Sequence, residues 1–238
     1  SALAGGADGY NATLALGSGG VHTYSQSTWA WSSLAQDAAG NIFLAHKISL
    51  TEIALKQWNG AGWTALTTLT TAMTGDTNFN DDLSLKIGAD GNPTLLYTGE
   101  KVITTGLESL RGIKSGHYDL ATHQWTTTNI DVASHPMGAR NYNDPVLTVT
   151  EDGVLHAVYY YSHAYDTTRE YSIKYASSSD NGATWSASTY LTTASSKDDL
   201  RQPTIVTDGD GTVHMFYLRE DNLTLSKANL YHTSKAAG

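Results

Sequence analysis

The chain has 238 residues, 40% of them hydrophobic, which is enough for a substantial buried core. Its 14 Lys and Arg residues stand against 23 Asp and Glu residues, and the formal charge of −9 argues against nucleic acid and anionic membranes as partners. Cysteine is absent and no apolar run reaches the roughly 18 residues of a membrane span, which excludes a disulfide framework, a thiolate zinc site and a helical membrane anchor within this sequence.

The first predicted element lies in residues 10–28 and contains the run "NATLALGSGGVHTYS". Apolar and polar residues alternate on both sides of a Gly-rich centre, which is typical of a β-hairpin. The run lies too close to the next hairpin to form a complete sheet of its own.

Four further hairpins share one pattern, in which an alternating apolar run meets a turn with Asp and Gly and continues into a second apolar run. Their sequences are "SSLAQDAAGNIFLAHK", "LSLKIGADGNPTLLYTG", "PVLTVTEDGVLHAVYYY" and "PTIVTDGDGTVHMFYLR". The turn residues Asp37, Asp90, Asp152 and Asp210 are 53, 62 and 58 residues apart. Periods of this size predict one four-stranded β-propeller blade per repeat.

A tryptophan recurs behind each of the first three hairpins, at Trp63, Trp125 and Trp185, with spacings of 62 and 60 residues. A fourth would fall near or beyond Gly238, so we predict that the N-terminal hairpin completes the last blade and closes the ring. We expect an all-β fold, a single small β-propeller domain over residues 1–238. Five blades, the last incomplete, are the alternative to four four-stranded antiparallel blades over residues 29–70, 79–132, 141–193 and 200–238, closed by residues 10–28.

One short stretch, "SSSDNGATWS", resembles the Asp-box, or BNR repeat, of sialidases and related propellers. Its S-x-D-x-G-x-T-W pattern is formed by Ser178, Asp180, Gly182, Thr184 and Trp185. Asp bonds the backbone of its own turn, Gly adopts a positive φ, and Trp fills the space between blades. In that family the box joins the two outer strands on the face opposite the active site. The resemblance therefore implies a structural role here and a site at the other face.

Two segments resemble the chemistry-bearing parts of related enzymes. "LRQPTIVTDGDGTVHMFYLRE" is similar to a sialidase segment with two substrate-facing arginines, which implies that role for Arg201 and Arg219. "NYNDPVLTVTEDGVLHAVYYYSH" resembles polysaccharide lyases with BNR-type propellers, which share its N-x-P, D-G and Tyr/His elements. The second resemblance implies a uronic acid polymer as substrate.

Alignment of the repeats on their turn Asp residues places Trp29 with Asp82, Asp144 and Gln202, and Thr28 with Asp81, Asn143 and Arg201. We predict that these positions ring the axial mouth. Acidic side chains gathered there would bind a cation or accept hydrogen bonds from sugar hydroxyls, and a Trp ring would stack on a sugar face. Alternatively, the Asp side chains cap the starts of the strands. The predicted binding set comprises Trp29, Trp31, Asp81, Asp82, Arg140, Asn143, Asp144 and Arg219.

Two connections between second and third strands are predicted to be long loops, "TGEKVITTGLESLRGIKSGH" and "YYSHAYDTTREYS". Long loops on a rigid scaffold often carry binding residues. For an enzyme, we predict Tyr161, His163 and Arg201 as the catalytic set, acting as acid, base and carboxylate neutraliser in β-elimination. The alternative for Tyr161 and His163 is packing alone.

The stretch "DTNFNDD" sets Asp76, Asn78, Asn80 and Asp82 at positions 1, 3, 5 and 7, as at the start of a calcium loop. The glycine and glutamate that complete an EF-hand are replaced by Asp81 and Ile87. Calcium is thus a candidate ligand, and alternate polar residues at the start of an extended strand are the alternative. No zinc spacing occurs, and we expect no required cofactor.

Three function classes remain, because a propeller fold does not fix function. The main prediction is a carbohydrate-recognition propeller of a secreted or cell-surface protein, favoured by the acidic composition and the incomplete catalytic set. The alternative is a glycan-processing enzyme, a glycoside hydrolase or polysaccharide lyase, and the third is a protein-interaction or adhesin scaffold. The expected partner is a glycan or polysaccharide, and the oligomeric state is left open.

Overall fold

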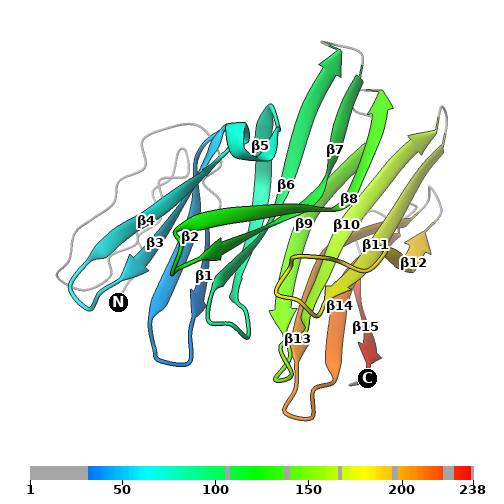
Figure 1. Ribbon diagram of the computed structural model, residues 1–238. Coiled ribbons are helices and arrows are strands. Elements are labelled where there is room, and N and C mark those ends of the chain that lie inside the picture. The colour runs from blue at the N-terminus through cyan, green and yellow to red at the C-terminus, as the bar shows by residue number, and fades with distance from the viewer. Residues whose placement is uncertain are drawn as a thin grey trace, which may run out of the picture.

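The computed structural model describes residues 32–104, 108–136, 140–165, 168–194, 198–221 and 228–236. These residues form four antiparallel sheets and one short helix. The sheets stand side by side in chain order, from blue to red (Figure 1). Within the described ranges, no helix is long and apolar enough to cross a membrane. The predicted N-terminal hairpin at residues 10–28 lies outside them.

Each sheet is a meander of consecutive strands. The first contains β1 (Ser32–Gln36), β2 (Ile42–Ser49), β3 (Glu52–Trp58) and β4 (Trp63–Thr70), and α1 (Thr71–Thr74) follows it. The second contains β5 (Asn78–Ile87), β6 (Pro93–Thr104), β7 (Glu108–Asp119) and β8 (Gln124–Pro136). The third contains β9 (Arg140–Val149), β10 (Leu155–Tyr165), β11 (Thr168–Ser178) and β12 (Thr189–Ala194). The described part of the fourth contains β13 (Asp198–Thr207), β14 (Val213–Asp221) and β15 (Ala228–Lys235).

The first strands of the sheets are neighbours in space. β5 contacts β1 on one side and β9 on the other, and β9 in turn contacts β13. Meander sheets whose first strands meet in this way radiate from a common line, as blades do in a propeller. The predicted all-β, propeller-like fold is therefore confirmed, whereas closure of the ring by residues 10–28 stays a prediction.

Four equivalent turns join the first and second strands. In each, the first residue of the turn bonds the residue four positions later, and a Gly with positive φ bonds back to the first residue. The turns begin at Asp37, Gly88, Thr150 and Asp208. Asp37 is thus equivalent to Asp208, and the predicted alignment of Asp37 with Asp210 is wrong by two residues. The corrected alignment moves Trp31, in place of Trp29, to the position of Asp82, and both tryptophans lie outside the described residues.

The expected long loops between second and third strands are mainly strand. β6 and β7 have 12 residues each, and β10 and β11 have 11 each, so the hairpins extend almost to their tips. Alternating Val, Ile, Tyr and Thr residues favour extended pairing and continue the ladder. The loop prediction is therefore wrong for both segments.

Hydrophobic clusters fill the spaces between successive sheets. The first packs Phe43 and Leu55 against Leu85 and Tyr97, the second surrounds Tyr159, and the third joins residues of β10 and β11 to residues of β13 and β14. Serine hydroxyls also link neighbouring first strands, since Ser33 Oγ accepts the Leu85 N–H at 3.0 Å and Ser84 Oγ accepts the Leu147 N–H at 3.1 Å. These two bonds occupy equivalent positions in the repeat.

The turn between β11 and β12 has the local chemistry expected of its residues. Asp180 Oδ1 accepts the Thr184 N–H at 2.8 Å, Ser178 Oγ accepts the Gly182 N–H at 2.9 Å, and Gly182 has a φ of 88°. Trp185 Nε1 donates to Ser115 Oγ on the preceding blade at 3.0 Å. Trp185 therefore links the second and third sheets, and we call its ring packing and its bond to Ser115 the Trp185 staple.

Truncation of Trp185 tests this staple. We expect Trp185→Ala to lower the free energy of unfolding by about 2–3 kcal/mol, because the ring is partly buried between two blades. Trp185→Phe keeps a ring but loses the bond to Ser115, and it should cost only about 1 kcal/mol. Urea denaturation followed by far-UV circular dichroism measures both, and a Trp185→Ala loss no larger than that of Trp185→Phe would contradict the staple.

Candidate functional site

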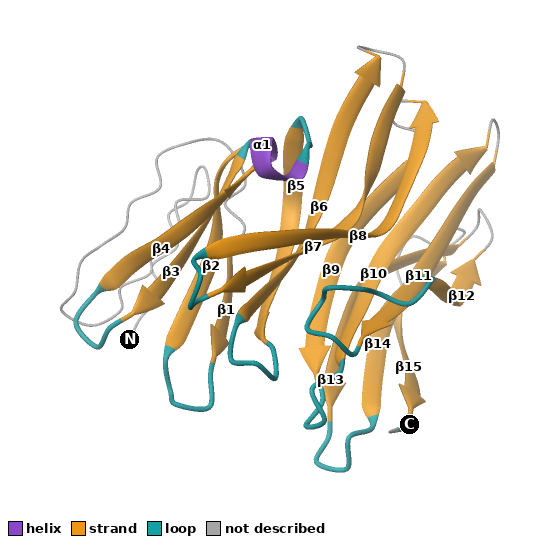
Figure 2. Ribbon diagram, in the orientation of Figure 1, coloured by secondary structure: helices purple, strands orange, loops and turns teal. Residues whose placement is uncertain are grey.

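The two ends of the blades differ in their connections. The four equivalent turns and the β11–β12 turn lie at one end, here called the turn end, and those that join β1 to β2, β5 to β6 and β13 to β14 form the lower edge of Figure 2. The strands β5, β9 and β13 begin at the opposite end, here called the mouth end. The connections from one blade to the next also lie there, so the mouth end is where the predicted site residues are to be sought.

The first strands share an irregularity near their starts. Pairing shifts between Phe79 and Leu83 in β5, across residues 143–146 in β9 and between Arg201 and Thr204 in β13. Asp144 and Gln202 lie in these bulges with a φ of 50° each. Bulges and left-handed non-glycine residues are both enriched next to functional sites, where strain is retained for a purpose.

A chain of hydrogen bonds runs from blade to blade through these bulges. Asp82 Oδ2 accepts the backbone N–H of Asp144 at 3.0 Å. The Asp144 carboxyl in turn accepts the backbone N–H of Gln202. The predicted alignment of Asp82, Asp144 and Gln202 is confirmed, because all three lie at the bulge of their first strand. The two carboxyls also accept backbone N–H groups of the next first strand, which is the capping role given as the alternative.

Burial raises the pKa of the Asp144 carboxyl above its ordinary value. The Gln202 N–H and the positive charge of Arg201 act in the opposite direction but do not outweigh burial. Arg201 itself is half exposed, at 52% of its side chain, and lies 3.7 Å from Glu220. The mouth end therefore holds a carboxyl that resists ionisation, a second carboxylate on the adjacent strand, and an exposed guanidinium.

A second polar group forms where β7 meets β9. Arg111 donates to Asn141 Oδ1 at 3.3 Å and to Asn143 Oδ1 at 3.2 Å. Asn143 is thus held by the guanidinium of the preceding blade. This arrangement fixes the side chain next to Asp144 and keeps its amide dipole oriented.

Tyr161 and His163 lie on β10, two residues apart, with their ring centroids 6.5 Å apart. Tyr161 is only 4% exposed, packs on Tyr142 at 5.1 Å, and has the Lys174 ammonium 4.1 Å from its ring centre. Its surroundings are those of a core residue. Arg201 lies on β13 of the next blade. The catalytic roles predicted for Tyr161, His163 and Arg201 stay predictions.

The two arginines of the sialidase-like segment point to opposite faces of one sheet. Arg201 pairs with Leu218, whereas Arg219 pairs with Leu200, and adjacent residues of a strand face opposite sides. Arg219 faces Tyr231, with its guanidinium carbon 5.9 Å from the ring centre. The structure therefore does not bring this pair together.

The remaining members of the binding set are placed only in part. Trp29 and Trp31 lie outside the described residues. Asp81 lies within β5, and Arg140 begins β9 opposite His163. Arg140 thus lies at the mouth end by strand register.

The four residues of the candidate calcium stretch are divided between partners. Asp76 pairs with the Lys114 ammonium at 2.5 Å, and Asp82 accepts from the Asp144 backbone. Asn78 and Asn80 follow on β5, where Asn78 pairs with Glu100. Within the described ranges, no three His, Asp or Glu side chains gather as a metal site would require.

Two largely buried ion pairs were not predicted from the sequence, one from the connection before β5 to β7 and one between the second and third blades. Asp76 pairs with Lys114, and Asp131 pairs with Lys174 at 2.8 Å while also accepting from Tyr159 at 2.9 Å. A signal was present, because Lys56, Lys114 and Lys174 recur on the third strands at spacings of 58 and 60 residues. The acidic partners have no matching period, so the sequence alone does not pair them.

No family model matches the chain, and no curated protein matches it. Solved structures do. A Penicillium chrysogenum α-L-arabinanase complexed with arabinobiose is 14% identical with a TM-score of 0.58, and the match covers 86% of this chain and 62% of that one. A Fusarium graminearum α-L-arabinofuranosidase in complex with an iminosugar inhibitor is 13% identical with a TM-score of 0.57, over 86% and 62%.

A third structure, a Cellvibrio cellulosa α-L-arabinanase complexed with arabinohexaose, is 10% identical with a TM-score of 0.52, over 85% of this chain and 72% of that one. The chain spans 62% of the length of the first two structures. At these identities the likeness concerns the fold, and these structures are β-propellers. The propeller assignment thus has support from both the strand topology and the comparisons.

Proposed function

We propose that this propeller is a glycan-processing enzyme, a glycoside hydrolase that acts at the mouth end. The observation that carries the proposal is the pair Asp82 and Asp144, on equivalent bulges of adjacent first strands, one of them with a raised pKa. Glycoside hydrolysis needs two carboxyl groups, of which one gives a proton to the leaving oxygen and the other acts as carboxylate. Two carboxyls whose environments differ are a sign of such a division of roles.

In this mechanism Asp144 is the acid. Burial keeps its carboxyl protonated to higher pH than usual, and its proton passes to the glycosidic oxygen as the bond breaks. The nearby Arg201 charge then stabilises the carboxylate that remains. Asp82 is the second carboxylate, held in place because its Oδ2 accepts the Asp144 N–H. Water supplies the new bond at the anomeric carbon, either directly, with Asp82 accepting its proton, or by hydrolysis of a glycosyl intermediate on Asp82.

The substrate we propose is a neutral arabinofuranosyl polysaccharide, handled by a secreted or cell-surface protein. The structural neighbours include arabinanases in complex with arabinobiose and arabinohexaose. A net charge of −9 disfavours polyanionic glycans such as sialic acid or uronic acid polymers. The Asp-box resemblance then concerns the scaffold, as the Trp185 staple does.

A substrate panel tests the proposal. Purified protein is incubated with linear arabinan, branched arabinan, a sialoside and a uronic acid polymer, and both new reducing ends and unsaturated uronate absorbance are measured. We expect reducing ends from an arabinan alone, with no dependence on EDTA or added calcium. Release of unsaturated uronate would support instead β-elimination by Tyr161, His163 and Arg201, and no turnover of any polymer would contradict the hydrolase.

Glycan recognition without turnover is the second candidate. The specific observation in its favour is that both carboxyls already accept backbone N–H groups of the next blade, as purely structural caps would. Affinity electrophoresis in gels that contain each polymer separates the two. Retardation by an arabinan without product release would establish recognition in place of hydrolysis.

A further inference from the structure

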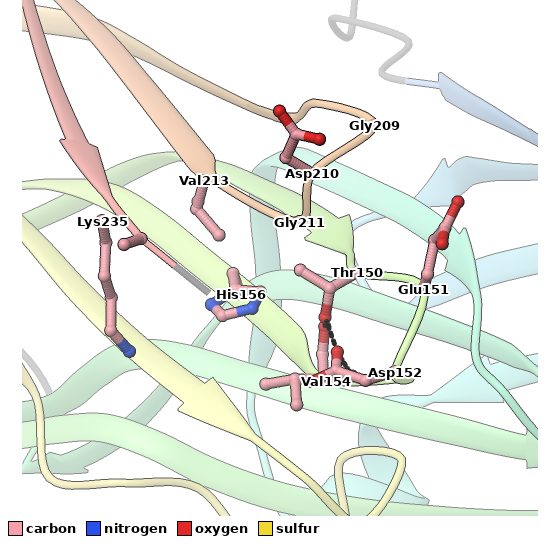
Figure 3. A pocket seen from close by; sticks show the side chains of 11 residues that line it. Thr150, Glu151, Asp152, Val154, His156, Gly209, Asp210, Gly211, Val213 and Lys235 are labelled. Carbon is pink, nitrogen blue, oxygen red and sulfur yellow. Dashed lines mark hydrogen bonds between the residues drawn. The ribbon is translucent and has the colours of Figure 1, made fainter. Parts of the chain in front are cut away.

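A cavity of about 360 Å³ lies at the turn end, between the third and fourth blades. Figure 3 shows its lining, to which the turns at Thr150 and Asp208 contribute Glu151, Asp152 and Asp210. His156 and Lys235 stand on the other side, and Val154 and Val213 supply apolar surface. The cavity is at the opposite end from Asp82 and Asp144, so it is separate from the proposed catalytic end.

His156 is the unusual member of this lining. The residue is only 5% exposed, yet its Nε2 has no hydrogen-bond partner among the described residues. Leaving a buried polar nitrogen unsatisfied costs about 1–3 kcal/mol, so such atoms commonly have a partner that is added from outside.

The hydrogen-bond network favours one tautomer of the His156 ring. Lys235 Nζ donates to the Tyr175 hydroxyl at 3.3 Å, since an ammonium has no acceptor. The hydroxyl is 2.6 Å from His156 Nδ1, and we assign its one proton to this bond. Nδ1 is then the acceptor and Nε2 carries the hydrogen. Burial and the Lys235 charge both lower the pKa of His156, which keeps this ring neutral.

The cavity therefore presents two kinds of polar group to a ligand. The Nε2–H of His156 and the ammonium of Lys235 donate, whereas the carboxylates of Glu151, Asp152 and Asp210 accept. Three carboxylates disfavour an anion. A hydroxyl accepts from one group and donates to another, and vicinal hydroxyls on one ring satisfy both sides while the C–H face rests on the two valines.

We propose that this cavity is an accessory carbohydrate site that holds a single sugar residue of a neutral glycan, with the His156 Nε2–H donating to a ring hydroxyl. A volume of 360 Å³ is at the small end of ligand pockets, which suits one sugar ring. The site would anchor a polysaccharide chain at the turn end while another part of it reaches the mouth end. The proposal does not depend on turnover at Asp82 and Asp144.

The test measures binding of methyl α-L-arabinofuranoside, methyl β-D-xylopyranoside and methyl β-D-galactopyranoside by ¹H–¹⁵N NMR, including the histidine ring nitrogens. We expect the apo spectrum to show the Nε2–H tautomer of His156, and at least one sugar to shift its signals saturably with a Kd on the order of 1 mM. His156→Gln and Lys235→Met should each weaken that binding at least fivefold. Asp210→Asn, at the exposed rim, supplies a third variant that leaves the buried network in place.

Two controls separate this site from the mouth end. Lys101→Met removes an exposed lysine of β6 near the mouth end and should leave sugar binding unchanged. Asp144→Asn should lower turnover about 10³-fold yet leave the turn-end signals and their affinity unchanged. The proposal is overturned if no sugar of the panel perturbs His156 saturably, if the ring is the Nδ1–H tautomer, or if folded Lys235→Met and Asp210→Asn proteins bind as the wild type does.

Discussion

Replacement of Asp144 by Asn is expected to lower kcat/KM for arabinan about 10³-fold, with little change in stability. Asn still offers an oxygen to the Gln202 N–H, so the bulge keeps its hydrogen bond, but the amide has no acidic proton for the leaving oxygen. Asp82→Asn should have an effect of similar size, because it preserves the acceptor for the Asp144 N–H and removes the carboxylate charge. Initial rates of reducing-end release measure both variants.

Glu52→Gln is the matched control, since Glu52 is an exposed carboxylate on β3. It should retain the wild-type rate. If Asp144→Asn and Asp82→Asn also retain that rate while their unfolding transitions are unchanged, the two carboxyls are structural caps and the hydrolytic site lies elsewhere.

The pH dependence of hydrolysis follows from the direction in which the pKa of Asp144 is shifted. The acid works only while protonated, so the rate should fall as pH rises through a pKa that is higher than usual for Asp. The same raised pKa also makes stability depend on pH. The stabilisation that Asp144 gives the folded state is fully present below the pKa of this carboxyl in the unfolded chain, and it is lost as pH rises through the higher pKa in the folded protein. Asp144→Asn should therefore flatten this part of the stability profile, measured as the urea midpoint across pH.

Removal of the Lys114 ammonium is expected to lower the free energy of unfolding by about 3–5 kcal/mol in Lys114→Met. Its partner Asp76 is 0% exposed, the ammonium bonds Asp76 Oδ1, and Asp76 Oδ2 has no hydrogen-bond partner within the described ranges. The carboxylate packs directly against Gly99, because its oxygens lie 2.7 and 2.9 Å from the position that a Cβ there would take. The variant thus leaves an uncompensated buried charge.

Two comparisons isolate that cause. Asp76→Asn added to Lys114→Met removes the charge and should recover at least about 2 kcal/mol of the loss. Lys174→Met in the next blade should cost less, because Asp131 is 15% exposed and still accepts from Tyr159 and Tyr142. Equal losses in Lys114→Met and Lys174→Met, or no recovery in the double variant, would contradict this explanation. Urea denaturation measures all three.

Much of the fold was predictable because blade structure repeats in sequence. The Asp and Gly turns and the alternating runs beside them mark four hairpins, and the observed sheets follow these marks. The alignment of the first repeat was wrong by two residues because Asp37 and Asp208 begin their turns, whereas Asp90, Asp152 and Asp210 are third in theirs. Hydrogen-bond position, and not residue identity, defines the equivalent residue.

For the candidate site, the sequence predicts which residues occupy equivalent strand positions, but not the contacts between them. Alignment placed Asp82, Asp144 and Gln202 together, and the bulges occur at those residues. The bonds that link them pass from one blade to the next, which a repeat pattern does not reveal. The opposite faces of Arg201 and Arg219 were missed for the same reason, since they depend on the pairing of neighbouring strands. The burial of Tyr161 agrees with the packing alternative.

The most direct test of the mouth-end site is a crystal structure of the Asp144→Asn protein with an arabino-oligosaccharide. We expect a glycosidic oxygen within hydrogen-bond distance, roughly 3 Å, of the substituted amide side chain at position 144, with the Asp82 carboxylate beside the same sugar ring. An oligosaccharide bound only at the turn end, or anywhere that leaves both position 144 and Asp82 out of contact, would contradict it.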